Sequence, residues 1–490
     1  MFKTTLKKKS SINIIPMIDV IFFLLVFFML FTTFRTTPEG IDMQLPKAVT
    51  ATEQSSENFI VQIDANGNYY YEDQKIENVR FIQEAIAQIF CRQWKQDDRI
   101  IIFTTKEAYE KNWQDQEKRE TKGLRKKLDN LNLNAQIINK PISNVTIQGT
   151  GETEIYERLN QLFDHIYQTI QNQDEIIFDI THAFRFQPML GLVLLHYSKL
   201  LKNIKIDRIL YGAFDVLGPA SQINEIPVEN RNVPILDLTQ FATLLEWTNG
   251  ADEFLNFGNA KKIKQLADQE IRPVLKNKQK RNVTAENINN LTKKLNEFAD
   301  DIATCRGRTL VEAKTLKTIK SLLPQIEDNI IPQLSPIIKE LDKKISEFEA
   351  EENVKNGFQA VRWCIDNNLI QQGITLLMET LITFIAKKFD LDYKEETSRN
   401  LVTDCFHIFN KGLPEERWKN ETIKQKELAD KILTSVFIKE LSYDYITLNR
   451  YRNDINHGGY LNNAMKANKF EDKLNELYTR IYSKIFPDVD

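Results

Sequence analysis

One short segment near the C-terminal end of the sequence combines the residue types needed to cleave a phosphodiester bond. Arg452 is followed directly by Asn453 and, five positions after the arginine, by His457. An arginine can stabilise negative charge on a phosphate, an amide can bond or orient it, and a histidine can transfer or position a proton. RNA carries its own nucleophile, the 2′-hydroxyl, so these side chains need no metal ion. Two interpretations of the segment stay open at this point: a site that acts on a phosphodiester, or ordinary polar residues on an exposed helix end.

The arginine–histidine spacing is not unique, so its surroundings decide between the candidates. Arg158 with His165, and Arg450 with His457, also give an arginine followed by a histidine. The first of these pairs falls on a charged helix in a region of alternating strands. Arg452 and His457 instead end a predicted helix, and Gly458-Gly459 is a helix stop signal. One arginine and one histidine make a small site, so we expect two copies of the chain to meet across a two-fold axis.

A glutamate on a neighbouring apolar segment is a further candidate. Glu379 stands within Leu376-Leu-Met-Glu-Thr-Leu-Ile, where every near neighbour but one is apolar. Two interpretations stay open for it: an ion pair with an active-site arginine, or a plain surface position.

Two other segments suit a phosphorylated ligand. Gln148–Glu152 contains Gly149, Thr150 and Gly151 and opens a predicted helix, whose N-terminus attracts phosphate. Asp179–Arg185 follows a predicted strand and supplies a hydroxyl, an imidazole and a guanidinium group. The alternative for each is an ordinary capped helix start. Open parallel sheets bind ligands beyond the carboxyl ends of their strands, so the joint placement favours a ligand site formed by Gly149, Thr150, Gly151, Thr181, His182, Phe184 and Arg185.

The first fifty residues predict a membrane span. Residues 12–34 contain Val20–Phe31, which is apolar without a break, and as a helix they would extend about 34 Å. Lysines precede the segment; Pro16 and Asp19 interrupt it, which makes a cleavable signal peptide the weaker interpretation. An acid inside a span is costly, so Asp19 is a functional candidate. The alternative is that Asp19 lies near the inner end and reaches the interface.

The rest of the chain divides into two patterns. Strand signals at Phe59–Asp64, 99–103, 135–138, 175–180 and 205–211 alternate with helical spacing, which predicts a βα sheet with crossover helices. A charged helix is predicted over Glu107–Leu131. Beyond Leu236 the strand signals stop, and helices are predicted over 261–348, 358–389 with a break near 366–368, 443–457 and 470–486. The fold class is therefore α/β followed by all-α, preceded by one transmembrane helix.

The amino-acid composition argues against several classes of function and of site. Lys and Arg total 65 against 68 Asp and Glu, a net charge of −3, which argues against coating duplex DNA. The four cysteines include no CxxC pair, so neither a disulfide framework nor a zinc ribbon is expected. With five histidines in the chain we expect no multi-histidine metal centre, no metal ligands and no cofactor.

The N-terminal segment resembles ExbD/TolR, the proton-driven energy-coupling subunits. The similar residues are Ile14-Ile-Pro-Met-Ile-Asp-Val, the Phe/Leu run and Gln44-Leu-Pro-Lys-Ala48. The resemblance covers about residues 9–50, with an extension to 75 through Phe59–Lys75. It implies that Asp19 carries a proton within the membrane.

Residues 68–490 resemble the CARF–HEPN ribonucleases of type III CRISPR systems. The segments that carry the resemblance are Asn78–Ala85, Thr104–Trp113, Asp179–Arg185, Tyr211–Phe214 and Pro234–Trp247, together with Arg452-Asn453…His457. The family opens with a strand and a Gly-rich loop that also touches its ligand. Here Gln62–Asn68 stands in that place and is more similar to ExbD.

The resemblance implies a fold and an activity. A Rossmann-like CARF domain would bind cyclic oligoadenylate through Thr181–Arg185, and a HEPN domain would cleave single-stranded RNA with Arg452, Asn453 and His457 in a homodimer. The expected domains are 1–50, the span and linker; 51–245, CARF; and 246–490, HEPN. The expected function is antiviral defence in the cytoplasm, with anchoring to the inner membrane through residues 12–34. The alternatives are a proton-driven transport subunit, and a CARF sensor or ring nuclease without RNA cleavage in the helical domain.

Overall fold

The computed structural model describes residues 59–63, 69–71, 74–76, 82–115, 123–142, 152–181, 187–213, 216, 218, 233–272, 275, 282–327, 335–460 and 462–487. The chain divides into two units, residues 1–45 and 46–490, and all the described residues belong to the second. The predicted span over residues 12–34, with Asp19, lies outside the described residues. Within the part that the structure describes, no helix is both long and apolar enough to cross a membrane.

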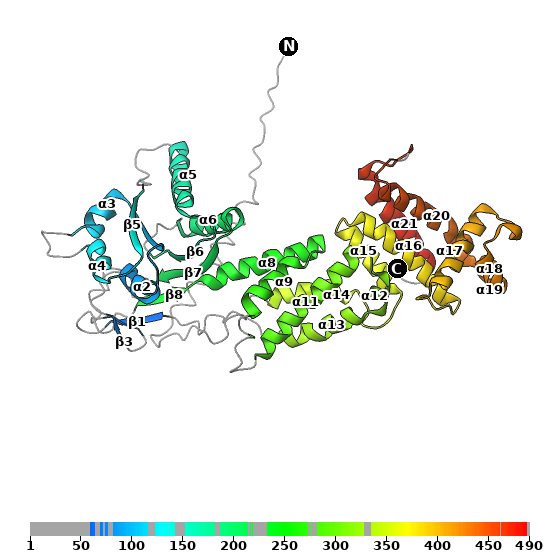
Figure 1. Cartoon of the computed structure of the whole chain (residues 1–490), viewed down its shortest axis with the longest axis horizontal. Coiled ribbons are helices and arrows are strands. Elements are labelled where there is room, and N and C mark those ends of the chain that lie inside the picture. The colour runs from blue at the N-terminus through cyan, green and yellow to red at the C-terminus, as the bar shows by residue number, and fades with distance from the viewer. Residues whose placement is uncertain are drawn as a thin grey trace, which may run out of the picture. The chain divides into compact units, whose positions relative to one another are not determined.

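The strands form two sheets rather than the single βα sheet that the sequence predicts (Figure 1). The larger has the order β3-β2-β1-β8-β7-β6, and the smaller consists of β4 and β5. Only β6–β7 and β4–β5 are parallel; the other pairs are antiparallel. The strands are β1 (Phe59–Ile63), β2 (Tyr69–Tyr71), β3 (Gln74–Ile76), β4 (Arg99–Thr104), β5 (Gln136–Pro141), β6 (Glu175–Asp179), β7 (Lys205–Gly212) and β8 (Val233–Asp237).

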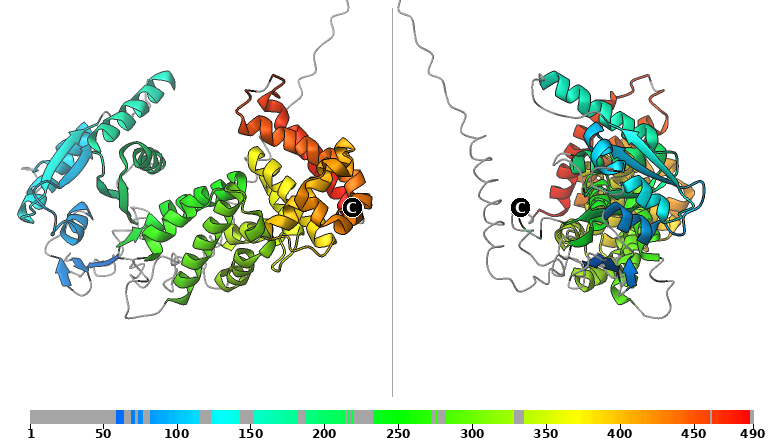
Figure 2. Two further views of the ribbon diagram at one scale, coloured as in Figure 1. Left: turned by 45° about the vertical axis from the view of Figure 1, so that its right-hand side comes forward. Right: turned by 90° about the vertical axis from the view of Figure 1, so that its left-hand side faces the viewer.

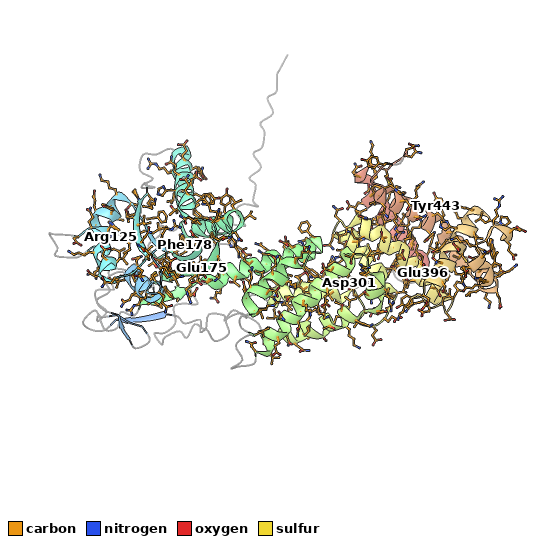
Figure 3. The ribbon with its side chains drawn as sticks, viewed as in Figure 1. Arg125, Glu175, Phe178, Asp301, Glu396 and Tyr443 are labelled. Carbon is orange, nitrogen blue, oxygen red and sulfur yellow. The ribbon has the colours of Figure 1, made fainter. Side chains whose placement is uncertain are left out.

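Helices cover both faces of the larger sheet. Side chains alternate along a strand, so Leu210 packs on one face beneath α2 (Ile82–Phe90), whereas Ile209 packs on the other with Leu195 of α6 (Gln187–Lys202). Phe178, labelled on β6 in Figure 3, belongs to the same second face. A separate hydrophobic cluster packs α2 and α4 (Leu124–Asn130) against strands β4 and β5. The remaining helices of this region are α3 (Lys106–Ala108) and α5 (Glu152–Thr169).

The predicted helix over Glu107–Leu131 is wrong, and the reason is local. After α3 the chain makes one π-helical turn at Tyr109–Trp113, and α4 begins only after Gly123. The Gly123 backbone is extended, and its N–H donates to Oδ1 of Asp115 at 2.7 Å. A Cβ at Gly123 would lie 2.3 Å from the carbonyl oxygen of Trp113, so only glycine allows this close approach.

β8 is a strand that the sequence analysis did not predict. Pro234 has no N–H, which argues against a strand with neighbours on both sides. In the structure β8 lies between β1 and β7, and the Pro234 carbonyl accepts a hydrogen bond from the N–H of Ala213 at 2.9 Å. Pairing on the carbonyl side is therefore enough to hold this short strand.

From Thr239 onward the described chain is helical, as predicted. Figure 2 shows these helices, coloured green to red, packed against one another as a bundle. Its single large core contains Phe298, Phe358 and Leu448. The helices are α8 (Thr239–Phe257), α9 (Lys261–Leu266), α11 (Val283–Ala303), α12 (Gly307–Glu312), α13 (Lys314–Glu327), α14 (Ser335–Ser346), α15 (Lys355–Asp366), α16 (Ile370–Lys388), α17 (Glu396–Lys411), α18 (Asn420–Lys424), α19 (Lys426–Thr434), α20 (Val436–Asn456) and α21 (Phe470–Ile485).

Helix α8 contributes to two hydrophobic cores. Ala242, near its start, is buried with Leu195 and Ile209 beside the sheet. Phe254, near its end, is fully buried in the helical core, with its ring 5.2 Å from that of Trp363. The predicted domain boundary between residues 245 and 246 falls inside this helix.

Candidate functional site

The predicted catalytic segment lies at the C-terminal end of α20. Helix α20 begins at Ser435, whose side chain caps Ile438 N–H, and ends at His457, whose N–H donates to the Asn453 carbonyl at 2.9 Å. Gly458 and Gly459 follow with φ of 64° and 76°, a left-handed conformation that favours glycine. The predicted helix end and its glycine stop signal are therefore confirmed. Asn453 and His457 are four residues apart on one face of the helix, and both are exposed.

Arg452 differs from most arginines of the helical region in having no counter-ion. Arg399 and Arg480 form ion pairs with Glu379 and Asp444. Arg452 is half-buried, its Nε has no hydrogen-bond partner, and within the described residues it forms no ion pair. A buried donor without an acceptor is uncommon in folded proteins, and a guanidinium group binds phosphate strongly. The geometry leaves Arg452 available for an anion.

Glu379 forms an ion pair, and its partner is Arg399 on α17 rather than Arg452. The Arg399 guanidinium also donates to Thr383 Oγ1 at 3.0 Å and to the Tyr393 carbonyl at 3.1 Å. The structure matches neither interpretation of Glu379, because the residue is paired and Arg399 is not one of the predicted active-site residues. Burial raises the pKa of Tyr445 on α20; Glu379 raises it further, and Arg452 and Arg399 lower it. These three charges therefore all act on Tyr445.

Two hydrogen bonds fix the end of α20. Gln371, in the first turn of α16, donates from Nε2 to Oδ1 of Asn456 at 3.2 Å. Asp454 is buried, and its Oδ2 accepts from the N–H of Met465 at 2.7 Å, which folds the following loop back onto the helix. Asp454 and Gln371 thus position the turn that carries Asn453 and His457.

Arg306 is a residue of this site that the sequence analysis missed. It lies in the turn between α11 and α12, next to Cys305, whose sulfur is 4.0 Å from the Gln372 carbonyl oxygen of α16. Burial raises the pKa of Cys305, whereas the charges of Arg452 and Arg306 lower it, so both arginines lie near this thiol. Arg306 is exposed and forms no ion pair with any residue that the structure describes. No pattern in the sequence relates position 452 to Cys305 and Arg306, because this proximity arises from the fold.

The rival arginine–histidine pair lies on α5, away from these residues in the chain. The His165 ring packs edge-on against Phe103 of β4, with centroids 6.2 Å apart. Its Nε2 is buried without a hydrogen-bond partner. Arg450, the other rival, is placed with its guanidinium 5.3 Å from the Tyr451 ring. The first pair therefore lacks a solvent-facing histidine, and in the second the arginine lies against an aromatic ring.

Thr181 is the one predicted ligand residue that the structure describes; Gly149, Thr150, Gly151, His182, Phe184 and Arg185 lie outside the described residues. The Thr181 hydroxyl donates to Oδ1 of Asp179 and accepts from the N–H of Gly212 at 2.8 Å. It thereby ties the end of β6 to the end of β7. The hydroxyl already has internal partners, so its first effect is to hold the start of the predicted ligand loop.

The same Asp-x-Thr arrangement occurs a second time, after β8. Oδ1 of Asp237 accepts from the N–H and the hydroxyl of Thr239, and Thr239 Oγ1 accepts from the N–H of Ile209 at 2.9 Å. Strand β7 is thus fastened by a threonine hydroxyl at two of its backbone N–H groups. The second motif gives a matched control for the first, because it lies outside the predicted loop.

No metal centre is evident in the part of the chain that the structure describes. Within it, no three or more His, Cys, Asp or Glu residues are grouped so that they could hold a metal ion.

Comparison with known proteins identifies two regions of similarity. The family model described as biopolymer transport protein ExbD/TolR matches residues 6–168, and that described as CRISPR-associated protein MJ1674, second domain, matches residues 243–356. Over 251 residues the chain is 27% identical to CRISPR-associated protein MJ1674 of Methanocaldococcus jannaschii, covering 50% of this chain and 34% of that protein. Over 71 residues it is 37% identical to a putative biopolymer transport protein ExbD of Synechocystis, covering 14% of this chain and 26% of that protein.

The predicted similarities to ExbD/TolR and to a CRISPR-associated protein are confirmed, and both differ in extent from the prediction. The CRISPR-associated family model matches residues 243–356, whereas the predicted range is 68–490. The ExbD/TolR match does not stop near residue 50 or 75 but continues to residue 168, within α5. The chain spans about a third of the length of the archaeal relative and about a quarter of that of the cyanobacterial one. Arg452, Asn453 and His457 lie outside both ranges matched by the family models.

Proposed function

We propose that this chain is a CRISPR-associated endoribonuclease that cyclic oligoadenylate activates and that cleaves single-stranded RNA without a metal ion. Similarity to a CRISPR-associated protein supports the general role. The observation that carries the activity is the end of α20, where an arginine without a counter-ion stands five residues before an exposed histidine. The ligand follows from the family resemblance of the Thr181–Arg185 segment.

The proposed reaction uses the 2′-hydroxyl of RNA as its nucleophile. That oxygen attacks the adjacent phosphorus and loses its proton, while the bond to the 5′-oxygen breaks and the leaving oxygen gains a proton. The products are a 2′,3′-cyclic phosphate and a 5′-hydroxyl. His457 transfers one of these protons, Arg452 stabilises the charge on the phosphate, and Asn453 bonds a phosphate oxygen. A second copy of the chain supplies the second histidine and arginine.

Helix α6 offers a surface for that second copy. Its exposed apolar side chains recur at helical spacing along one face, with Leu200 83% and Met189 71% exposed. Large exposed apolar faces on soluble proteins mark interaction sites. The helix leaves the predicted ligand loop, so two copies joined here would bring two ligand loops together. The face consists of Met189, Val193, Tyr197, Leu200 and Leu201.

The direct test uses the full chain with synthetic single-stranded RNA, EDTA, and either cyclic tetraadenylate or cyclic hexaadenylate. We expect ligand-stimulated cleavage that persists in EDTA and leaves 2′,3′-cyclic phosphate ends, detected by mass spectrometry. Products with 3′-hydroxyl ends, or a strict requirement for a divalent cation, would contradict the proposed chemistry.

The ExbD/TolR match supports a second candidate function, a proton-driven membrane transport subunit. The match reaches from residue 6 to residue 168 and includes Asp19. In that case the membrane span would be essential and the α20 residues dispensable. Asp19→Asn separates the two candidates, because it should leave RNA cleavage unchanged under the nuclease proposal and abolish proton-coupled transport under the other.

Thr181→Val is expected to weaken ligand binding, and Thr239→Val is its control. Each change leaves a backbone N–H of β7 without its hydroxyl acceptor, at Gly212 and Ile209 respectively, so each should lower the free energy of unfolding by about 1–3 kcal/mol. Only Thr181 lies at the predicted ligand loop. Calorimetric titration with cyclic oligoadenylate should therefore show a raised Kd for Thr181→Val alone. Equal Kd values for both variants and the wild type would remove Thr181 from the ligand site.

Arg306→Ala is expected to weaken RNA binding without slowing the chemical step. Loss of one phosphate contact should raise KM about tenfold and leave kcat nearly unchanged. The salt dependence of binding should also become shallower by about one unit of slope. Arg308→Ala is the matched control, because Arg308 stands two positions away and its Nε is paired with Glu312 Oε1 at 2.8 Å. An unchanged KM for Arg306→Ala, or an equal rise for Arg308→Ala, would contradict this role.

A further inference from the structure

A buried ionic cluster connects helix α6 to two helices of the C-terminal region. Glu246 lies on α8, 6% exposed, between the two cores to which that helix contributes. Its Oε1 is 3.0 Å from Lys199 Nζ and 3.4 Å from His196 Nδ1, both on α6. Its Oε2 is 2.6 Å from Lys262 Nζ on α9. We name these four residues the Glu246 cluster.

The cluster holds Glu246 firmly in its charged form. The nearby His196, together with Lys262 and Lys199, keeps the pKa of this carboxyl well below its usual range even though burial opposes ionisation. A carboxylate this buried is tolerated only while its cations stay in place, because removing a partner leaves an uncompensated charge. The positions of α6 and α9 are therefore tied to α8 through one side chain.

A second carboxyl group, that of Glu270, also responds to the lysines of the Glu246 cluster. Trp247, the next residue on α8, donates from Nε1 to Oε2 of Glu270 at 2.9 Å. Burial raises the pKa of Glu270 to about 7; the charge of Glu246 raises it as well, while Lys199 and Lys262 lower it. The two carboxyl groups thus share the same lysines. A shift of Lys199 with α6 changes the electrostatics on both α8 and the helical turn at Ala267–Ile271.

Helix α6 connects the Glu246 cluster to the proposed ligand segment. Helix α6 begins at Gln187, directly after the Thr181–Arg185 segment that is proposed to hold the ligand, and carries Lys199 in its last turn. On the other side, α9 and the end of α8 pack into the helical core through Ile263 and Phe254. Ligand contacts and helical core are therefore joined by a continuous series of packed elements, α6, α8 and α9.

We propose that the Glu246 cluster couples ligand binding to RNA cleavage by transmitting the position of α6 to α8 and α9. This inference rests on the proposed function. Coupling between two sites requires an element whose equilibrium both of them bias. A displaced α6 either carries α8 with it or leaves Glu246 buried without Lys199 and His196. Glu246 is a positioning residue in this scheme, since it touches neither the ligand nor the RNA.

Glu246→Gln tests the proposal, and Glu312→Gln is its matched control. Glu312 also has three cations close by, Arg308 at 2.8 Å, Lys314 at 3.1 Å and Lys394 at 3.4 Å, but it lies within the helical region. Both glutamines keep the side-chain shape and remove the charge. We expect Glu246→Gln to reduce the ratio of stimulated to unstimulated RNA cleavage at least tenfold, with unstimulated cleavage retained. Glu312→Gln should keep the wild-type ratio.

Hydrogen exchange supplies a readout that does not depend on cleavage. In the wild type, cyclic tetraadenylate or cyclic hexaadenylate should change amide exchange in α6, α8 and α9, whereas in Glu246→Gln the change should stay within α6. A wild-type activation ratio in Glu246→Gln, with wild-type exchange in α9, would overturn the coupling role. If the wild-type chain shows no ligand-stimulated cleavage, the proposed function itself fails. Should Glu246→Gln not fold, Lys262→Gln carries the same test, because it keeps Glu246 paired with Lys199.

Discussion

His457→Ala is expected to reduce RNA cleavage by about 10²–10⁴-fold, and Arg452→Ala by about 10²–10³-fold. His457 is the proposed proton-transfer group and is exposed at the end of α20, and Arg452, five positions earlier, has no counter-ion among the described residues. Both variants should bind cyclic oligoadenylate as the wild type does, because they lie in a different region from the predicted ligand loop. Single-turnover rates with saturating ligand give the measurement.

The rival pair on α5 supplies the control for this prediction. Arg158→Ala and His165→Ala remove an arginine and a histidine of similar spacing, and His165 packs against Phe103 rather than facing solvent. We expect these variants to retain cleavage within about a factor of ten after correction for any loss of folded protein. Wild-type rates in purified His457→Ala, or abolished cleavage in folded His165→Ala, would move the active site from α20 to α5.

Val193→Glu combined with Leu200→Glu is expected to convert a dimer into monomers and to lower RNA cleavage at least 100-fold. Both residues lie on the exposed apolar face of α6, and two carboxylates placed there would meet their counterparts across a two-fold axis. The loss of rate follows because a monomer has one arginine and one histidine instead of two of each. Sedimentation equilibrium and initial rates measured at the same protein concentration give the two quantities.

Val283→Glu is the control for the α6 variant. Val283 is 54% exposed at the start of α11, where a glutamate is compatible with the helix N-terminus. It should leave both mass and activity unchanged. A double α6 variant that stays dimeric and active would mean that the face serves another partner, and a monomeric variant that cleaves normally would mean that one copy contains a complete site.

Local signals in the sequence were sufficient to predict most helices of the C-terminal region. The predicted break near residues 366–368 separates α15 from α16, and the predicted end of α20 at His457 is observed. Both depend on features within a few residues: a left-handed Asn368 after the first helix, and two glycines after the second. Such signals act through backbone conformation alone, so they can be recognised without knowing the fold.

The features that the sequence did not reveal depend on residues far apart in the chain. The separation of β4 and β5 from the larger sheet, the pairing of Glu379 with Arg399, and the influence of Arg452 on Cys305 all arise from tertiary packing. The Gly123 backbone is another case, because its constraint is a contact with Trp113 in a preceding segment. Periodicity and residue type describe one element at a time, and none of these contacts lies within one element.

Because helix α8 contributes to two hydrophobic cores, it bears on how the protein divides into folding units. Its first turns belong to the core beside the sheet and its last turns to the helical core, so melting either core removes support from the other. The two regions should therefore unfold cooperatively rather than as independent modules. The family match that begins at residue 243 starts inside this helix, which means that a unit of shared ancestry and a unit of folding do not coincide here. Recombination that joined a new N-terminal region to the helical region would have had to supply the first turns of α8 as well.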